Sequence, residues 1–311
     1  MHADAPLMAL DSANQRVLSG DFDRSLSLGE KAARFPYRGF VEVRLPGARP
    51  FLMFSNNDDV VAQHSLYDER PGFEATSLRI WTHLAQKVTA VYDVGAFTGI
   101  YALAAAAANP RARVYAFEPS GNTYHRLVTN VWANELNTVI APLQFALGSA
   151  AARAEIRHPF GVYVLGSGES ILASVVKEAW FTEQIDVVRA DDLEAMLSAT
   201  PRRLIIPEPG GRCELAKIDV EGYEVSVLQG MAGILKRDEP VLLIECLDLR
   251  AVEGVSACLT DWSHRFVDDE GLAIHQSPER FTQAHSRNVL FFSPRRAAEV
   301  ASVAEAGVSF D

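Results

Sequence analysis

The sequence predicts an α/β fold built on a doubly wound, mostly parallel sheet. An apolar segment at residues 90–94 is followed by a turn with glycines at Gly95 and Gly99 and then by an alanine-rich helix. A second apolar segment, residues 113–117, ends directly before Glu118. Strand, glycine turn, helix and a strand ending in an acid are the units of a nucleotide-binding half-fold. These two segments therefore place a nucleotide-type ligand at the carboxyl edge of the sheet.

The spacing of the glycines indicates which ligand this turn suits. A dinucleotide turn, G-x-G-x-x-G, would need glycines at positions 95, 97 and 100, where Phe97 and Ile100 occupy the last two. The observed pattern is D-x-G-x-x-x-G, beginning at Asp93. A carboxylate beside the turn would repel a pyrophosphate but suit the ammonium of an amino acid next to a sulfonium. The pattern therefore predicts S-adenosylmethionine as the cofactor.

The glycines and Glu118 are the residues whose chemistry best fits this cofactor. Gly95 and Gly99 lack Cβ, so we expect their backbone to pass close to the ligand. Glu118 ends its strand where an acid accepts hydrogen bonds from two ribose hydroxyls. A purely structural unit with a chance glycine pair is the alternative, and the two acids at successive strand ends argue against it. The predicted cofactor-binding residues are Asp93, Val94, Gly95, Ala96, Gly99, Glu118, Pro119, Ala146 and Asp219.

The chain is expected to divide into an N-terminal extension, residues 1–88, and a cofactor-binding domain, residues 89–311. The extension contains a loose or helical lead-in (1–35), a β-hairpin (40–45 with 50–54) and two helices (58–70 and 74–87). The domain contains predicted strands at 90–94, 113–117, 138–147, 214–219, 240–245 and 288–292. Its predicted helices include one after Gly121 with Trp132 on the apolar face, one at 224–236 and one at 252–261.

A β insertion is expected after the third strand of the domain. Residues 153–190 exceed what a simple doubly wound fold requires, and short strands are predicted at 154–158, 162–165 and 185–189. A loop rich in proline and glycine is predicted at 201–212.

Composition restricts the partners of the protein. The 311 residues are 48% hydrophobic and 22% charged, which is ordinary for a globular protein. With 29 basic and 40 acidic residues the net charge is −11, which argues against nucleic acid or an anionic membrane as a partner. The three cysteines show no C-x-x-C spacing, and the N-terminus has no secretory pattern. We therefore expect a cytoplasmic protein that acts on a small molecule, with its oligomeric state left open.

Four predicted strands end in an acid: Asp93, Glu118, Asp219 and Glu245. Ligands of open α/β sheets bind beyond the carboxyl ends of the strands. We predict Asp219, Glu221 and Glu245 as catalytic residues, because a carboxylate beside an acceptor hydroxyl can take its proton. Two of these carboxylates could instead hold a divalent cation. No histidine-rich or multi-aspartate segment supports a metal, so none is expected to be required.

Several other titratable residues have simpler explanations. Glu224 is expected to stabilise the start of a helix through the helix dipole. His158, His275 and His285 are candidate bases, but packing or surface roles are expected for them.

The motifs of the chain resemble those of the FkbM family of S-adenosylmethionine-dependent methyltransferases. The resemblance covers roughly residues 40–292, and its most specific segment is Lys217-Ile-Asp-Val-Glu-Gly-Tyr-Glu224. The other matching motifs are Asp93-Val-Gly-Ala-Phe-Thr-Gly99, Phe117-Glu-Pro119, Ala146-Leu-Gly148, Asp191-Asp-Leu193, Val227-Leu-Gln-Gly230 and Ile244-Glu245. The resemblance implies a class I methyltransferase (Rossmann-like) fold and methylation of a hydroxyl on a natural product or carbohydrate. The chain departs from the family at Phe97-Thr98, where asparagine is more common, and in the 201–212 loop.

Other functions are left open by the sequence. One is methylation of a different acceptor atom, although the acid-Pro-Pro-aromatic turn of nucleobase amino-methyltransferases is replaced here by Asp219-Val-Glu-Gly-Tyr223. A nicotinamide-dependent oxidoreductase is disfavoured by the glycine spacing. A binding module without catalysis is disfavoured by the complete set of acids.

Overall fold

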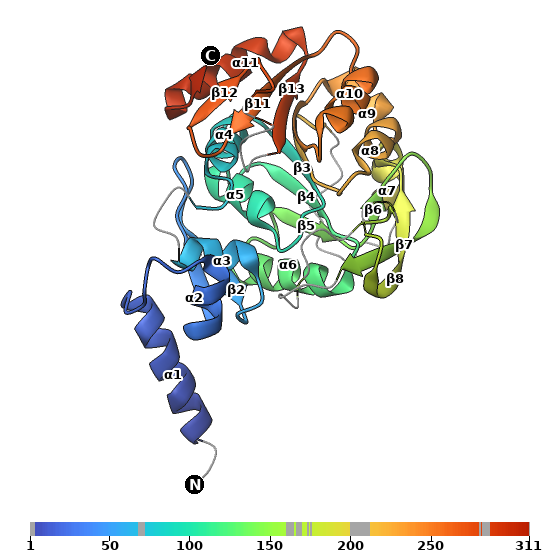
Figure 1. The fold of residues 1–311 in the computed structure, drawn as a ribbon. Helices are drawn as coiled ribbons and strands as arrows, with labels where there is room; N and C mark the ends of the chain where they lie inside the picture. The colour runs from blue at the N-terminus through green and yellow to red at the C-terminus, as the bar shows by residue number, and fades with distance from the viewer. Residues whose placement is uncertain are drawn as a thin grey trace.

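The computed structural model describes residues 4–67, 72–159, 165, 170–172, 174, 176–199, 212–279, 281 and 287–310. Its centre is a nine-stranded sheet with the order β14-β12-β11-β13-β10-β9-β3-β4-β5 (Figure 1). The strands are β3 (Ala90–Val94), β4 (Arg113–Phe117), β5 (Ile140–Leu143), β9 (Leu215–Ile218), β10 (Val241–Glu245), β11 (Ser263–Asp268), β12 (Ala273–His275), β13 (Asn288–Phe292) and β14 (Ser309–Phe310).

The strand directions define a doubly wound fold. Strands β5, β4, β3, β9 and β10 are parallel neighbours, and β13 joins β10 in the antiparallel sense. The chain runs outward from β3 to β5 and then returns to place β9 on the other side of β3. This reversal creates a crevice at the carboxyl ends of β3 and β9, where ligands of such sheets bind. The predicted class I methyltransferase fold is confirmed.

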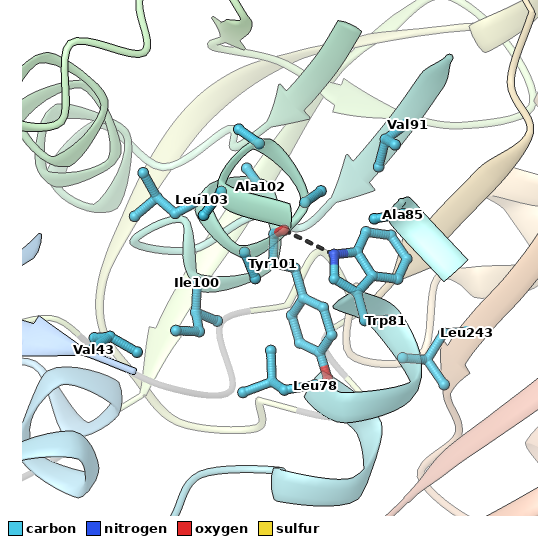
Figure 2. Close-up of a cluster of buried hydrophobic side chains, with 14 of the residues drawn as sticks. Val43, Leu78, Trp81, Ala85, Val91, Ile100, Tyr101, Ala102, Leu103 and Leu243 are labelled. Carbon is cyan, nitrogen blue, oxygen red and sulfur yellow. Dashed lines mark hydrogen bonds between the residues drawn. The ribbon is translucent and has the colours of Figure 1, made fainter. Parts of the chain in front are cut away.

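Helices cover both faces of the sheet. They include α4 (Ala75–Ala85), the last helix of the N-terminal extension. The helices of the domain are α5 (Ile100–Ala108), α6 (Gly121–Ala133), α7 (Leu193–Ala199), α8 (Glu224–Gly230), α9 (Ala232–Asp238), α10 (Leu249–Cys258) and α11 (Ala297–Ala301). The small side chains of α5 let it pack tightly, because Ala102 to Ala106 are fully buried. Figure 2 shows how α4 and α5 are joined, with the Trp81 indole N–H donating to the carbonyl of Tyr101 over 2.8 Å. No helix of the described residues is long and apolar enough to cross a membrane.

The N-terminal extension docks on α6 through polar contacts. It contains α1 (Asp4–Leu18), α2 (Leu28–Arg34), the predicted hairpin of β1 (Gly39–Val43) and β2 (Phe51–Ser55), and α3 (Val60–Tyr67). The side-chain carbonyl of Asn130 accepts from the Phe54 N–H, and the Asn134 amide bonds both backbone groups of Leu52, each over 2.7 Å. These two asparagines satisfy the outer edge of β2, as a neighbouring strand would. In Figure 1, α1 projects away from this assembly.

The structure corrects the predicted strand at 138–147. Strand β5 ends at Leu143, and the Phe145 N–H bonds the Leu143 carbonyl, so the chain turns there. The next two residues form β6 (Ala146–Leu147) in a separate sheet with β7 (Ala152–Pro159) and β8 (Ala179–Val188). This sheet is the predicted insertion. The predicted strand at 162–165 and the loop at 201–212 fall almost entirely outside the described residues.

Other boundaries also differ from the prediction. The helix expected at 224–236 is broken into α8 and α9 at Met231. Beside this break, Gly230 packs closely against the backbone of Gly148. A Cβ on Gly230 would lie 1.8 Å from the carbonyl oxygen of Gly148. Trp132, expected on the apolar face of α6, is 60% exposed. Strands β11 and β12 were not predicted, since the His264 and Arg265 segment lacks the alternation of apolar and polar residues that indicates a strand.

Candidate functional site

A cavity of about 250 Å³ opens at the carboxyl ends of β3, β4, β9 and β10. This is the crevice that the strand order predicts. The predicted site residues that line it are Val94, Gly95, Ala96, Glu118, Pro119, Ala146, Asp219, Glu221 and Glu245. Two predicted residues, Asp93 and Gly99, do not line it. The structure therefore brings most of the predicted residues together around one space.

Position 95 requires a glycine because another segment of the backbone packs against it. Gly95 has a φ of 79°, and a Cβ at this position would lie 1.8 Å from the carbonyl oxygen of Asp219. Gly95 therefore admits the backbone that follows β9, and it also lines the cavity where we expect the ligand. Gly99 has a φ of 101° at the start of α5, and a Cβ there would meet Leu127 at 2.6 Å. Its role is structural as well.

Asp93 lies beneath the turn. Its side chain is 1% exposed, and one oxygen accepts the N–H of Ala102 over 2.8 Å. Burial raises the pKa of Asp93 to about 7, although Lys217 and this hydrogen bond act in the opposite direction. Asp93 was expected to face a cationic ligand; in this structure it does not line the cavity, and its carboxylate bonds the first turn of α5.

Glu118 is fixed by the backbone on both sides. One carboxylate oxygen accepts the N–H of Phe97 over 2.8 Å, and the other accepts the N–H of Ser120 over 2.9 Å. The residue is 5% exposed and lines the cavity. Phe97 has a φ of 51°, which few residues other than glycine adopt. The carboxylate of Glu118 is thus held rigidly beside the glycine turn.

Three carboxylates gather at the other side of the cavity. Oxygen atoms of Asp219, Glu221 and Glu245 lie within 4.8 Å of one another. The ammonium of Lys217 donates to Asp219 over 3.0 Å, and its side chain is 1% exposed. The set combines three acids with one lysine that the sequence analysis did not select.

The charges in this group shift the pKa values in different directions. Burial raises the pKa of Asp219, but the Lys217 ammonium and hydrogen bonds from Glu245 and Lys217 outweigh it and leave the pKa low. The Asp219 charge and burial raise the pKa of Glu245 far above its usual range. The two carboxyl groups therefore differ in acidity, with Asp219 the stronger acid of the pair. Burial and the Asp219 charge raise the pKa of Glu221 to about 7, so this carboxyl titrates near neutral pH.

The loop that carries Glu221 has a strained backbone. Glu221 has a φ of 50° and is followed by Gly222 with a φ of 96°. The Ser170 hydroxyl donates to the carbonyl of Glu221 over 2.8 Å. Glu224 accepts the N–H of Gly222 over 2.9 Å at the start of α8, consistent with its predicted place at a helix terminus. Strain of this kind is retained where the surroundings fix a side chain for a purpose.

Two residues of charged type in the cavity wall, Lys217 and Glu74, were missed by the sequence analysis. Lys217 could have been found, because a lysine inside the apolar strand β9 has to be paired if it is buried. Glu74 comes from the extension, with a φ of 40°. Its Oε2 accepts from the Tyr101 hydroxyl and from the Asn288 amide, the latter over 2.8 Å. No sequence signal marked Glu74, because a left-handed backbone at a glutamate cannot be read from residue type.

The candidate histidines lie elsewhere. His158 stacks on Phe181 with ring centres 3.9 Å apart, and His275 has its Nε2 3.7 Å from a carboxylate oxygen of Asp268. Neither histidine lines the cavity. His285 lies outside the described residues. The described base candidates at the cavity are therefore carboxylates.

Comparison with known proteins gives one family match and several similar proteins. A family model described as the methyltransferase FkbM domain matches residues 93–270. Hexuronic acid methyltransferase AglP of Haloferax volcanii is 26% identical over 163 residues, covering 52% of this chain and 58% of AglP. AMB antimetabolite synthetase AmbE of Pseudomonas aeruginosa is 29% identical over 204 residues, covering 56% of this chain and 9% of AmbE. The chain thus spans less than two thirds of each of these relatives.

Two solved structures are also similar. Methyltransferase FkbM from Methylobacillus flagellatus is 19% identical, with a TM-score of 0.41, over 66% of this chain and 43% of that one. The O-methyltransferase TomG from Streptomyces achromogenes is 12% identical, with a TM-score of 0.39, over 73% of this chain and 82% of that one.

Proposed function

Since the chain belongs to the FkbM family of methyltransferases, we propose that it transfers a methyl group from S-adenosylmethionine to a hydroxyl of a small natural product or carbohydrate. The observation that carries this proposal is that Glu118 and Glu221 line the same cavity. Glu118 supplies a carboxylate suited to ribose hydroxyls. Glu221 supplies a carboxyl that titrates near neutral pH and can take a proton. Membership of this family also decides against the oxidoreductase alternative.

The residues on the β4 side of the cavity fit the proposed cofactor. Glu118 keeps its two carboxylate oxygens at the cavity wall with the backbone donors of Phe97 and Ser120 fixing them. Each carboxylate oxygen has more than one lone pair, so it can still accept from a hydroxyl. The cofactor-binding residues that we retain for the site are Val94, Gly95, Ala96, Glu118, Pro119, Ala146 and Asp219.

When bound, S-adenosylmethionine supplies a methyl group activated by its attachment to a sulfonium. The chain has to align the acceptor oxygen with that methyl group and remove the hydroxyl proton. Glu221 would take the proton that the acceptor hydroxyl loses on methylation. Lys217 keeps Asp219 ionised in the same wall of the cavity, and the Asp219 charge holds the pKa of Glu245 high.

The N-terminal extension contributes to the wall of the cavity. Val60, Val61, Phe73 and Glu74 line the cavity together with residues of the central sheet. We therefore treat residues 1–88 as an extension packed on a methyltransferase domain of residues 89–311. The name of AglP, a hexuronic acid methyltransferase, supports a carbohydrate among the acceptors to be tested.

The function is tested by incubating the protein with S-adenosylmethionine and a panel of sugars, uronic acids, phenols and amines. We expect a hydroxylated acceptor to gain one methyl group, detected by mass spectrometry, with release of S-adenosylhomocysteine. If Glu221→Gln no longer forms the methylated acceptor but still binds S-adenosylhomocysteine with unchanged affinity, the result supports Glu221 as the base. Methylation at nitrogen or carbon alone would contradict the O-methyltransferase assignment while leaving the methyltransferase itself intact.

A further inference from the structure

A lysine and a glutamate, Lys217 and Glu74, face the cavity at the β9 side, away from Glu118. Lys217 and Glu74 both line this part, and the Tyr101 side chain contacts each of them. The Lys217 ammonium lies 5.1 Å from the centre of the Tyr101 ring. Because β3 lies between β4 and β9, the glycine turn separates this pair from Glu118. A ligand that spans the cavity from Glu118 across the turn would therefore place its far end at Lys217 and Glu74.

Both residues have bonding capacity that the described residues leave unused. An ammonium has three N–H donors, and among the described residues Asp219 is the one hydrogen-bond acceptor of Lys217. The two donors to Glu74 in the described part of the chain both bind Oε2, which leaves Oε1 for the cavity. The left-handed backbone of Glu74, with φ 40° and ψ 50°, fixes that carboxylate where a relaxed backbone would not.

A cation and an anion at one end of a cavity match a zwitterion. The amino-acid end of S-adenosylmethionine carries an α-ammonium and an α-carboxylate, and a charge removed from water has to be paired. Lys217 keeps its charge, because Asp219, Glu74 and Glu245 outweigh the effect of burial and raise its pKa. Uncharged acceptors such as simple sugars would not need both charges.

We propose that Lys217 and Glu74 bind the amino-acid end of the cofactor, with Lys217 holding its carboxylate and Oε1 of Glu74 its ammonium. The inference rests on the proposed function, because it requires S-adenosylmethionine as the ligand. It gives the N-terminal extension a direct part in cofactor binding through Glu74. It also assigns to Lys217 and Glu74 the ion-pair role that the sequence analysis had sought at Asp93.

Binding calorimetry with three ligands separates these contacts. S-adenosylhomocysteine carries both charges, its decarboxylated analogue carries only the ammonium, and 5′-methylthioadenosine carries neither. We expect Lys217→Met to weaken binding of S-adenosylhomocysteine by about tenfold to a hundredfold, the loss of a charged hydrogen bond. Lys217→Met should leave the affinities of the other two ligands nearly unchanged. Glu74→Gln should weaken both ligands that carry the ammonium and spare 5′-methylthioadenosine.

For each variant, we compare the ratio of the dissociation constants of two ligands with the same ratio in the unaltered protein. A general loosening of the cavity weakens all ligands alike and cancels in this ratio, as in a double-mutant cycle. Lys236→Met, at an exposed lysine of α9, is the matched control and should change none of the ratios. Equal losses for all three ligands in Lys217→Met and Glu74→Gln would overturn the inference. So would an unchanged affinity for S-adenosylhomocysteine combined with impaired turnover, which would move both residues to the acceptor. If the unaltered protein binds none of the three ligands, the proposed function itself fails.

Discussion

The ammonium of Lys217 lies 3.0 Å from the carboxylate of Asp219 in the wall of the cavity. This contact keeps Asp219 ionised at the pH where Glu221 changes its charge. A carboxylate stabilised in this way is a weak proton acceptor. The ion pair therefore favours Glu221 as the proposed general base over Asp219, the first candidate by strand position.

Glu221→Gln should lower turnover by roughly 10²–10⁴-fold, the usual contribution of a general base. In the unaltered enzyme the rate should rise with pH through about 7, because Glu221 must be ionised to accept the proton. Asp219→Asn should move this rise to lower pH, because the Asp219 charge helps to raise the pKa of Glu221. Profiles of rate against pH for the three proteins test this, and a profile that Glu221→Gln leaves unchanged in shape would exclude Glu221 as the base.

Asp93→Asn should separate the structural role of Asp93 from ligand binding. A carboxyl whose pKa rises from 3.8 to about 7 on folding keeps its proton at pH values where the unfolded chain has released it. The free energy of unfolding therefore falls as pH rises through this window. An asparagine side chain cannot titrate, so the variant should show a shallower fall between these pH values in urea denaturation. A large loss of S-adenosylhomocysteine affinity in the folded variant would instead show that Asp93 contacts the cofactor.

Gly95→Ala should destabilise the fold, because its Cβ would come 1.8 Å from the Asp219 carbonyl oxygen. Gly72→Ala is the matched control: Gly72 has a similar φ of 85°, but a Cβ there meets nothing within 4 Å. The control isolates the backbone cost, which is on the order of 1 kcal/mol. We expect the melting temperature to fall further for Gly95→Ala than for Gly72→Ala. Equal shifts would contradict the close approach of the turn to β9.

Removal of divalent cations should leave methyl transfer intact. The three carboxylates near Asp219 could hold a metal by distance alone, since their oxygens lie within 4.8 Å. However, the Lys217 ammonium already supplies a positive charge there, and the raised pKa of Glu245 makes this carboxyl a poorer metal ligand. With an acceptor from the panel, turnover after treatment with a chelator should match that of untreated enzyme. Loss of turnover that magnesium restores would show that a cation bridges these carboxylates.

The sequence was sufficient for the parts of the fold that depend on local pattern. The apolar segment ending at Glu118 and the glycine turn after β3 indicated both strands of the cofactor half and its ligand edge. The closing strand was predicted with the boundaries that the structure shows, Asn288–Phe292. Its apolar run is buried on both faces, which is the pattern most easily identified.

The features that the sequence did not reveal depend on contacts between distant segments. The break after Leu143 and the pairing of Ala146 with the insertion depend on β8, which follows about 40 residues later. Glu74 reaches the cavity because α4 packs on α5, which places the glutamate beside Tyr101. The packing around Gly95 and Asp93 was not predicted, because residue type shows that a turn is tight but not which atoms crowd it.

The central claim, that this cavity binds S-adenosylmethionine through its ribose and amino-acid ends, is tested most directly by calorimetric titration with S-adenosylhomocysteine and with NAD. We expect S-adenosylhomocysteine to bind with a dissociation constant on the order of micromolar and to raise the melting temperature by mass action. Glu118→Ala should weaken this binding by about 1.5–3 kcal/mol, because a charged acceptor of hydrogen bonds is lost. Tight binding of NAD without any response to S-adenosylhomocysteine would contradict the account.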